Sequence, residues 1–140
     1  MVKVPCQIVL KKIKNKTISS NLINGDIYQL PFKDDEFDLC WNLGTIEHLK
    51  LPCLALLEMK RIAKRHVICC VPAPSIIWRF ATFTRRIVET DCSLWTENTI
   101  YYEEAELKVL FEEAGFSNVC VEQQRFLWIP LVNIVFGVKN

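Results

Sequence analysis

The spacing of apolar residues predicts three helices. In residues 52–64, leucine and isoleucine recur at roughly helical intervals, and a proline stands in the first turn. In residues 103–114 the apolar side chains form one stripe, and Gly115 follows where a helix would end. Residues 75–88 also look helical and mix aromatic with arginine side chains. These segments divide the chain into alternating helical and extended parts.

Short apolar runs predict the first strands. The run HVICCV at residues 66–71, which Pro72 ends, is typical of a strand covered on both faces in a parallel sheet. The segment FDLCW at residues 37–41 follows an acidic turn and indicates a second buried strand. Residues 21–24 indicate a shorter strand that a Gly-Asp pair ends.

The order of these elements indicates the fold class. Strands alternate with helices between residues 21 and 114, which favours an α/β fold with a mostly parallel sheet and helices on its faces. The last two predicted strands, residues 118–124 and 132–138, have no helix between them, so we expect an antiparallel hairpin at one edge. Residues 2–10 fit either a strand or a helix. With no repeat or linker visible, we expect one domain over residues 1–140.

Composition narrows the class of protein. The 17 basic and 16 acidic residues give a net charge of +1, which argues against a nucleic-acid-binding protein. No apolar run reaches the ~18 residues of a membrane-spanning helix, and residues 126–138, the nearest, suit the core of an edge strand. The seven cysteines are odd in number and follow no signal pattern, so we expect reduced thiols in a cytoplasmic protein. They show no C-x2-C spacing, so we expect no metal site.

The candidate chemistry lies in residues 24–49, which read NGDIYQLPFKDDEFDLCWNLGTIEHL. A Gly-Asp turn, a Leu-Pro-Phe step and an acidic loop precede a buried strand, and an Asn-x-Gly segment and a Glu-His pair follow it. Asp26 and Asn42 each follow a predicted strand, and open α/β sheets bind their ligands at the carboxyl ends of strands. The sequence therefore predicts that the two strand ends lie side by side and form one ligand site.

This ordered set continues with LLEMKRI, VICCVP and EEAELKVLFEEAGF further along the chain. Together these pieces resemble the later two-thirds of class I S-adenosylmethionine (SAM)-dependent methyltransferases, and they are most similar to the small-molecule methyltransferase type 11 group. The resemblance implies a partial Rossmann-like methyltransferase sheet and SAM as the cofactor. It implies that Asp26 meets the adenine amine and that Ile27 lies against the adenine ring. It places Asn42, Leu43 and Gly44 beside the methionine part of SAM.

The resemblance also indicates a substrate side. Residues 78–83 fall where this family often inserts a substrate-covering element, which makes Trp78 and Phe80 candidates and suggests a small apolar or aromatic acceptor. His48 is a further candidate on the substrate side, because histidine titrates near neutral pH. Methyl transfer from a sulfonium needs mainly the alignment of three atoms, so we assign no catalytic residue.

Each candidate also has a purely structural explanation. Asp26 suits an Asx-turn that ends a strand, and the segment at Asn42 suits an ordinary turn. Glu47 and His48 suit a pair at a helix terminus. The aromatic segment 78–83 suits an amphipathic helix that packs its rings inward. The sequence leaves these alternatives open.

One part of the family pattern is missing. Residues 1–24 contain no glycine, whereas such enzymes hold the methionine end of SAM with a Gly-rich loop after their first strand. We therefore expect an N-terminally incomplete domain, with SAM-dependent methyl transfer impaired in this chain alone. The alternative is a non-catalytic interaction module of methyltransferase origin. Such a module would bind a partner chain or a second copy through an exposed sheet edge.

Overall fold

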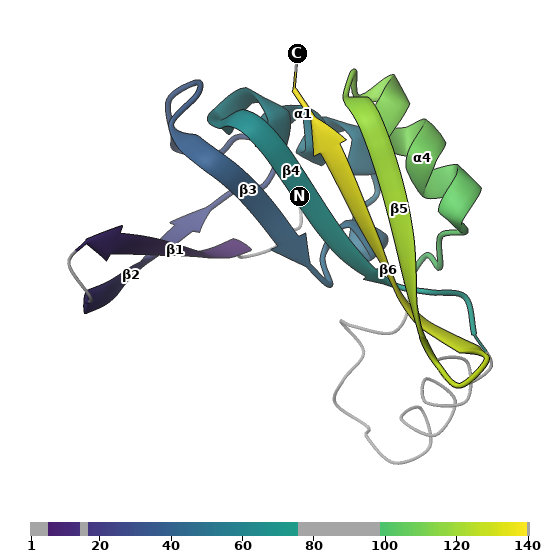
Figure 1. Ribbon diagram of the computed structural model, residues 1–140. Helices are drawn as coiled ribbons and strands as arrows, with labels where there is room; N and C mark the ends of the chain where they lie inside the picture. The colour runs from purple at the N-terminus through teal and green to yellow at the C-terminus, as the bar shows by residue number, and fades with distance from the viewer. Residues whose placement is uncertain (1–5, 15–16, 76–98, 140) are drawn as a thin grey trace, which may run out of the picture.

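The computed structural model describes residues 6–14, 17–75 and 99–139, with side chains from residue 23 onward. These residues form two separate sheets (Figure 1). The smaller is an antiparallel hairpin of β1 (Cys6–Lys14) and β2 (Thr17–Gly25). The larger has the strand order β3-β4-β6-β5. Its strands are β3 (Phe37–Leu43), β4 (Ala63–Pro72), β5 (Ser117–Phe126) and β6 (Ile129–Val138).

The larger sheet confirms the α/β fold class. Strands β3 and β4 are parallel, whereas β6 pairs antiparallel with both β4 and β5. The predicted C-terminal antiparallel hairpin is therefore confirmed. The four-stranded sheet is mixed rather than mostly parallel, because β6 inserts between β4 and β5 and adds two antiparallel pairs. Consequently β6 is an interior strand, and β5 is the edge strand of the hairpin.

The N-terminal segment differs from expectation. Residues 2–10, which fit a strand or a helix, contribute to a strand from Cys6, and the strand predicted at residues 21–24 extends over Thr17–Gly25. Strand β2 pairs with β1 and lies outside the four-stranded sheet. The strands that end at Asn24 and Trp41 therefore belong to different sheets, and the expectation that their ends form one ligand site stays a prediction. Among the described residues β2 has no parallel neighbour, and the local hairpin satisfies its backbone groups instead.

Two helices and a single 3-10 turn complete the described fold. The predicted helices are confirmed as α1 (Pro52–Ile62) and α4 (Glu104–Glu113), and η1 (Ile46–His48) precedes α1. Helix α4 begins with a capping box, in which Glu103 and Glu106 each accept a hydrogen bond from the other's backbone N–H. The helix predicted at residues 75–88 lies almost entirely outside the described residues.

Both described helices pack on the same face of the sheet (Figure 1). Their buried side chains form one core with the strand residues that face them. This core includes Ala55, Leu56, Met59, Leu107 and Phe111 from the helices and Val67, Cys69 and Val135 from the sheet. The alternation of strands and helices predicts helices on the faces of the sheet, and the described helices cover only one face.

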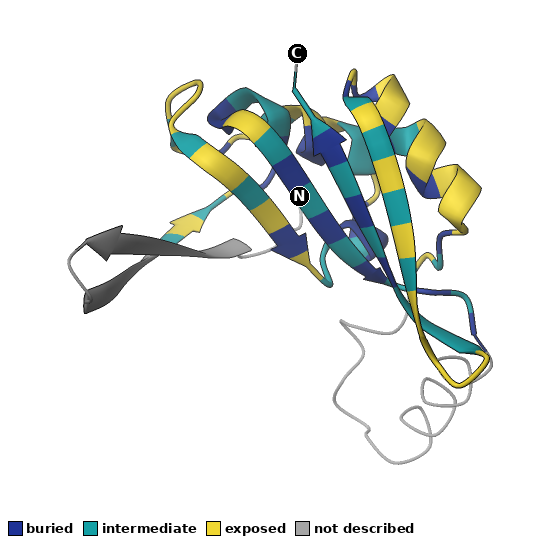
Figure 2. Cartoon of the chain, viewed as in Figure 1, coloured by how far each residue is buried: buried dark blue, intermediate teal, exposed yellow. Residues whose placement is uncertain are grey.

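The opposite face of the sheet carries a row of apolar side chains. Trp41 is aligned with Ile68 of β4, which in turn is aligned with Phe136 of β6. On β3 the side chains of Leu39, Trp41 and Leu43 are 46%, 61% and 66% exposed (Figure 2). From His66 onward, strand β4 accordingly alternates half-buried with buried residues, so its second face is covered only in part.

Candidate functional site

The candidate site begins where the chain leaves β3. Because β3 and β4 are parallel, their carboxyl ends lie at the same edge of the sheet. Gly44 has a φ of +64°, a backbone conformation that glycine adopts without strain, and its N–H donates to the Cys70 carbonyl at 2.9 Å. A Cβ atom on Gly44 would lie 3.5 Å from Glu47 Oε1. The turn at Gly44 therefore brings the Glu47 carboxyl back against the end of β3.

Glu47 is the least expected member of the site. Its side chain is only 2% exposed, and no described atom hydrogen-bonds to its buried Oε2. The Glu47 carbonyl accepts a hydrogen bond from the Ile100 N–H at 2.8 Å, so the loop before α4 closes against this residue. Burial raises the pKa of Glu47 to about 7. The carboxyl can therefore take up or release a proton near neutral pH.

His48 lies next to this carboxyl. Its Nε2 is 3.9 Å from Glu47 Oε1, and its Nδ1 is 3.3 Å from the Thr99 hydroxyl. Burial lowers the pKa of His48, because the charged imidazolium is less well solvated than in water. Sequence reasoning selected His48 and treated Glu47 as its neighbour. The sequence signal for Glu47 was its position as the one acidic residue in the mostly uncharged segment that follows the strand.

The other candidates after β3 face different surroundings. Asn42 is 9% exposed, and its buried Oδ1 has no hydrogen-bond partner among the described atoms. Leu43 is 66% exposed. A buried acceptor without a partner costs about 1–3 kcal/mol, so Asn42 Oδ1 and Glu47 Oε2 suit a ligand that donates N–H groups. Both acceptor atoms belong to residues of one short segment, which runs from the end of β3 into η1.

Asp26 and Ile27 follow the end of β2. Asp26 is exposed, and its Oδ1 accepts a hydrogen bond from the Tyr28 N–H at 3.0 Å. This contact forms the Asx-turn that was the structural explanation for Asp26. Ile27 is 4% exposed and belongs to the same core cluster as Ile46 of η1. This shared core places the turn at Asp26 and the segment after β3 around one group of apolar side chains. Trp78 and Phe80 lie outside the described residues.

Arg61 of α1 holds the loop that follows Asp26. Its guanidinium donates to the carbonyls of Leu30 at 3.0 Å and Phe32 at 2.8 Å. Glu58, which pairs with Arg61 at 2.9 Å, accepts a hydrogen bond from the Leu30 N–H at 3.0 Å. The planar guanidinium can serve several acceptors at once. This clamp fixes the loop against α1.

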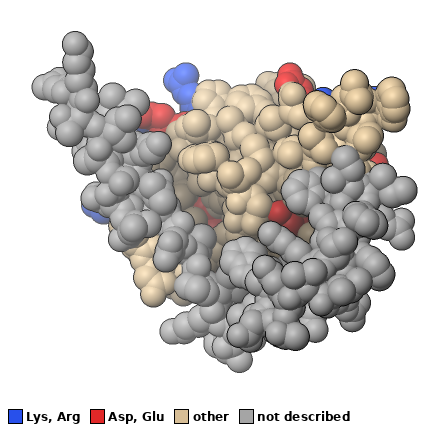
Figure 3. Space-filling model, turned by 90° about the horizontal axis from the view of Figure 1, so that it is seen from below, with Lys and Arg blue, Asp and Glu red and all other residues tan. Residues whose placement is uncertain are grey.

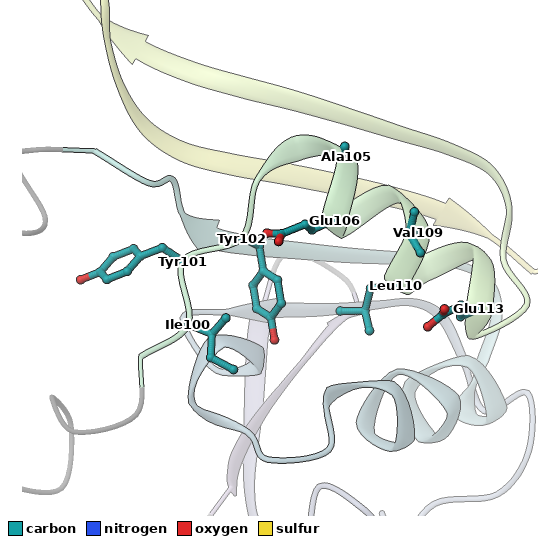
Figure 4. A pocket seen from close by; sticks show the side chains of 8 residues that line it. All are labelled: Ile100, Tyr101, Tyr102, Ala105, Glu106, Val109, Leu110 and Glu113. Atoms are coloured by element: carbon teal, nitrogen blue, oxygen red, sulfur yellow. The ribbon is translucent and has the colours of Figure 1, made fainter.

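A separate apolar groove lies on α4 beside the loop that closes on Glu47 (Figure 4). Its volume is about 460 Å³. In the close view Tyr102, Ile100 and Leu110 approach one another, and Tyr101 points away. None of the predicted site residues lines this groove. Its lining residues are Ile100, Tyr101, Tyr102, Ala105, Glu106, Val109, Leu110 and Glu113.

The described surface on the side where β3 and β4 end is mostly uncharged (Figure 3). Figure 3 shows the molecule from this side, and most of the described surface is neither basic nor acidic. Within the described part of the chain, no group of histidine, cysteine or acidic side chains could hold a metal ion. The five cysteines whose side chains the structure describes are reduced thiols. No described helix is long and apolar enough to cross a membrane.

Comparison with known families and proteins gives consistent matches. Residues 4–71 match the model of a family described as "Methyltransferase domain". An uncharacterized methyltransferase of Schizosaccharomyces pombe is 42% identical over 65 residues, covering 46% of this chain and 23% of that protein. A demethylmenaquinone methyltransferase of Staphylococcus aureus is 30% identical over 128 residues, covering 77% of this chain and 53% of that protein. The chain thus spans about half the length of the bacterial relative and about a quarter of the length of the yeast relative.

Solved structures share the fold. A SAM-dependent methyltransferase of Thermotoga maritima, described as a possible histamine N-methyltransferase, is 23% identical with a TM-score of 0.62. The match covers 83% of this chain and 62% of that chain. A second match is a magnesium protoporphyrin IX methyltransferase of Synechocystis, solved with bound S-adenosylhomocysteine. It is 18% identical with a TM-score of 0.53, and the match covers 83% of this chain and 49% of that chain. At these identities the likeness concerns the fold.

Proposed function

Because this chain belongs to the methyltransferase type 11 family and has the class I SAM-dependent methyltransferase fold, we propose that it binds SAM and supports methyl transfer to a small, apolar or aromatic acceptor in the cytoplasm. The supporting observation is the pair of buried acceptors without partners, Asn42 Oδ1 and Glu47 Oε2, at the carboxyl end of β3. The bacterial relative supports the acceptor class, since its name specifies demethylmenaquinone, a quinone.

The residues present fit part of SAM. Asn42 Oδ1 and Glu47 Oε2 would accept hydrogen bonds from its ammonium group, and Gly44 lets the backbone approach the methionine part. Asp26 is exposed at the loop that Arg61 holds, where its carboxylate can receive the adenine amine. When bound, SAM supplies an electrophilic methyl group, and the chain contributes mainly alignment.

Calorimetric titration of the chain with SAM tests this site. We expect binding with a dissociation constant in the high micromolar range, since no Gly-rich loop holds the methionine end in residues 1–24. Asn42→Ala should weaken binding by about 10-fold or more, because it removes a hydrogen bond to a charged group. Gln124→Ala, an exposed amide on β5, is the control and should bind as the unmodified chain does. A chain that gives no heat at millimolar SAM would lack a self-sufficient site.

The exposed edge of β3 supports a second candidate, a non-catalytic module that associates with another chain. Among the described strands β3 pairs only with β4. It carries neither lysine nor proline, the residues that commonly protect edge strands. An antiparallel pairing of two copies centred on Trp41 would place Leu39 of each copy opposite Leu43 of the other. The apolar row is thus self-complementary, as a two-fold interface requires.

Light scattering at several concentrations tests this second candidate. We expect a mass that rises with concentration for the unmodified chain and a monomer for Trp41→Lys, because a buried lysine at the centre of the pairing opposes it. Val109→Lys, which changes a 52% exposed residue of α4, is the matched control and should leave association unchanged. A strictly monomeric chain that binds SAM would argue against the module.

A further inference from the structure

The turn between β5 and β6 exposes three large apolar side chains in sequence. Phe126, Leu127 and Trp128, which we call the apolar tip, are 64%, 72% and 80% exposed. The turn has two residues, since Phe126 pairs with Ile129. Figure 2 shows the tip as one of the exposed parts of the hairpin. The apolar tip is thus the most exposed apolar segment among the residues that the structure describes.

Local turn chemistry does not explain these residues. Leu127 has a φ of 57°, in the left-handed region that two-residue hairpin turns use. Asparagine, aspartate and glycine suit this conformation, whereas leucine is strained in it. The turn therefore holds an exposed apolar residue against the local backbone preference. Such a conflict between local preference and sequence is expected at functional positions.

The apolar tip lies at the same edge of the sheet as the candidate site. Pro72, at the carboxyl end of β4, is aligned with Val132 of β6, and the Ala73 N–H donates to the Leu131 carbonyl at 3.1 Å. Because β6 is antiparallel to β4, residues before Val132 extend past that end. Figure 1 shows the hairpin projecting beyond β4 there. A flat surface in contact with the tip would therefore face the edge that carries Asn42 and Glu47.

The chemistry of the tip matches the interface of a lipid bilayer. Tryptophan is enriched at membrane–water interfaces, and phenylalanine and leucine enter the acyl region beneath. Residues 126–138 contain no charged side chain. Arg125 immediately precedes the tip. Its Nε donates to Gln123 Oε1 at 2.7 Å and its Nη2 lies 4.0 Å from Glu104 Oε1, but its side chain is 57% exposed, so its guanidinium can also meet lipid phosphates. A bilayer also needs no pre-shaped pocket to accommodate three consecutive exposed side chains at a turn.

We propose that the apolar tip inserts into the surface of a phospholipid bilayer and presents the carboxyl-end edge of the sheet to an acceptor dissolved in that bilayer. The second part rests on the proposed function. The first part does not, because insertion of the tip requires no SAM. Failure of SAM binding and failure of membrane binding are therefore separate results.

Co-sedimentation with phosphatidylcholine vesicles, without SAM or other protein, tests the insertion. The variant Phe126→Ser/Leu127→Asn/Trp128→Ser removes the apolar surface and gives the turn a residue that suits a positive φ. We expect the unmodified chain to partition onto vesicles about 10-fold more strongly than this variant. Val109→Ser, which removes a 52% exposed apolar residue from α4, is the control and should sediment like the unmodified chain. Equal urea midpoints would show that the triple variant is folded.

Quenching by brominated lipids identifies the inserted residue. The chain has four tryptophans, so the unmodified chain is compared with Trp128→Phe, which retains an apolar tip. We expect Trp128→Phe to sediment with vesicles but to lose most of the quenching. Three results would overturn the proposal: no sedimentation of the unmodified chain, equal sedimentation of the triple variant, or unchanged quenching in Trp128→Phe. Sedimentation that requires an added protein would also overturn it, in favour of a protein partner.

Discussion

Replacing Phe111 with alanine is expected to lower the free energy of unfolding by about 3–5 kcal/mol. The ring is fully buried, and its centroid lies 5.1 Å from that of Phe116. A Cβ atom on Gly137 would lie only 2.9 Å from Phe111 Cδ1, so the ring rests directly on the backbone of β6. Removing it leaves a cavity between α4 and the sheet. A loss of this size is a large part of the ~5–15 kcal/mol that stabilises a typical domain.

Urea unfolding followed by circular dichroism measures this loss. The matched control is Val109→Ala on the same helix, where the side chain is 52% exposed and the change should stay within about 0.5 kcal/mol. If Phe111→Ala costs no more than this control, the described core is not what holds α4 on the sheet. A lower slope of unfolding free energy against urea would instead indicate that the variant no longer unfolds in two states.

Local patterns account for the parts of the fold that could be predicted. Helix α4 and strand β4 follow from hydrophobic periodicity and from stop signals such as Gly115, because burial of one face decides such elements within a few residues of sequence. The hairpin of β5 and β6 follows equally from two apolar runs with no helix between them. These elements depend on neighbours in sequence, and the structure confirms them.

Pairing and burial account for the parts that could not be predicted. The strand before Asp26 is visible in the sequence, but its partner is decided by which other strands exist, and here only β1 is available to it among the described residues. Glu47 is buried beside a segment distant in sequence, since its carbonyl accepts a hydrogen bond from the Ile100 N–H, and no hydrophobic periodicity indicates such a contact. The clamp formed by Arg61 likewise joins two segments that are distant in sequence.

Replacing Glu47 with glutamine is expected to stabilise the folded chain at pH 8 by up to about 3 kcal/mol. The pKa of this carboxyl rises from 4.5 to about 7 on folding because of burial. Between these values the folded state binds the proton and the unfolded state does not, so stability falls as pH rises from about 4.5 to 7. Each unit of difference is worth about 1.4 kcal/mol. A neutral amide does not carry this cost, so the two proteins should differ little near pH 4 and most above pH 7.

Urea unfolding of both proteins at pH 5 and pH 8 measures this linkage. His48 contributes the opposite trend, since its lowered pKa removes stability as pH falls below its unfolded value of 6.5. The comparison of Glu47→Gln with the unmodified chain cancels that contribution. Glu112→Gln on the exposed side of α4 is the control and should show no gain at pH 8. A gain that is the same at both pH values would mean that the Glu47 carboxyl does not titrate between them.

The same variant separates structure from function. An amide at position 47 offers an oxygen acceptor but no negative charge, so we expect Glu47→Gln to bind SAM more weakly while it resists urea better at pH 8. A substitution that improves folding and impairs binding is typical of a strained or destabilised site whose cost serves the ligand. If Glu47→Gln improves stability and leaves SAM affinity unchanged, the buried carboxyl does not hold the ammonium group. The site must then rest on Asn42 and on the loop at Asp26.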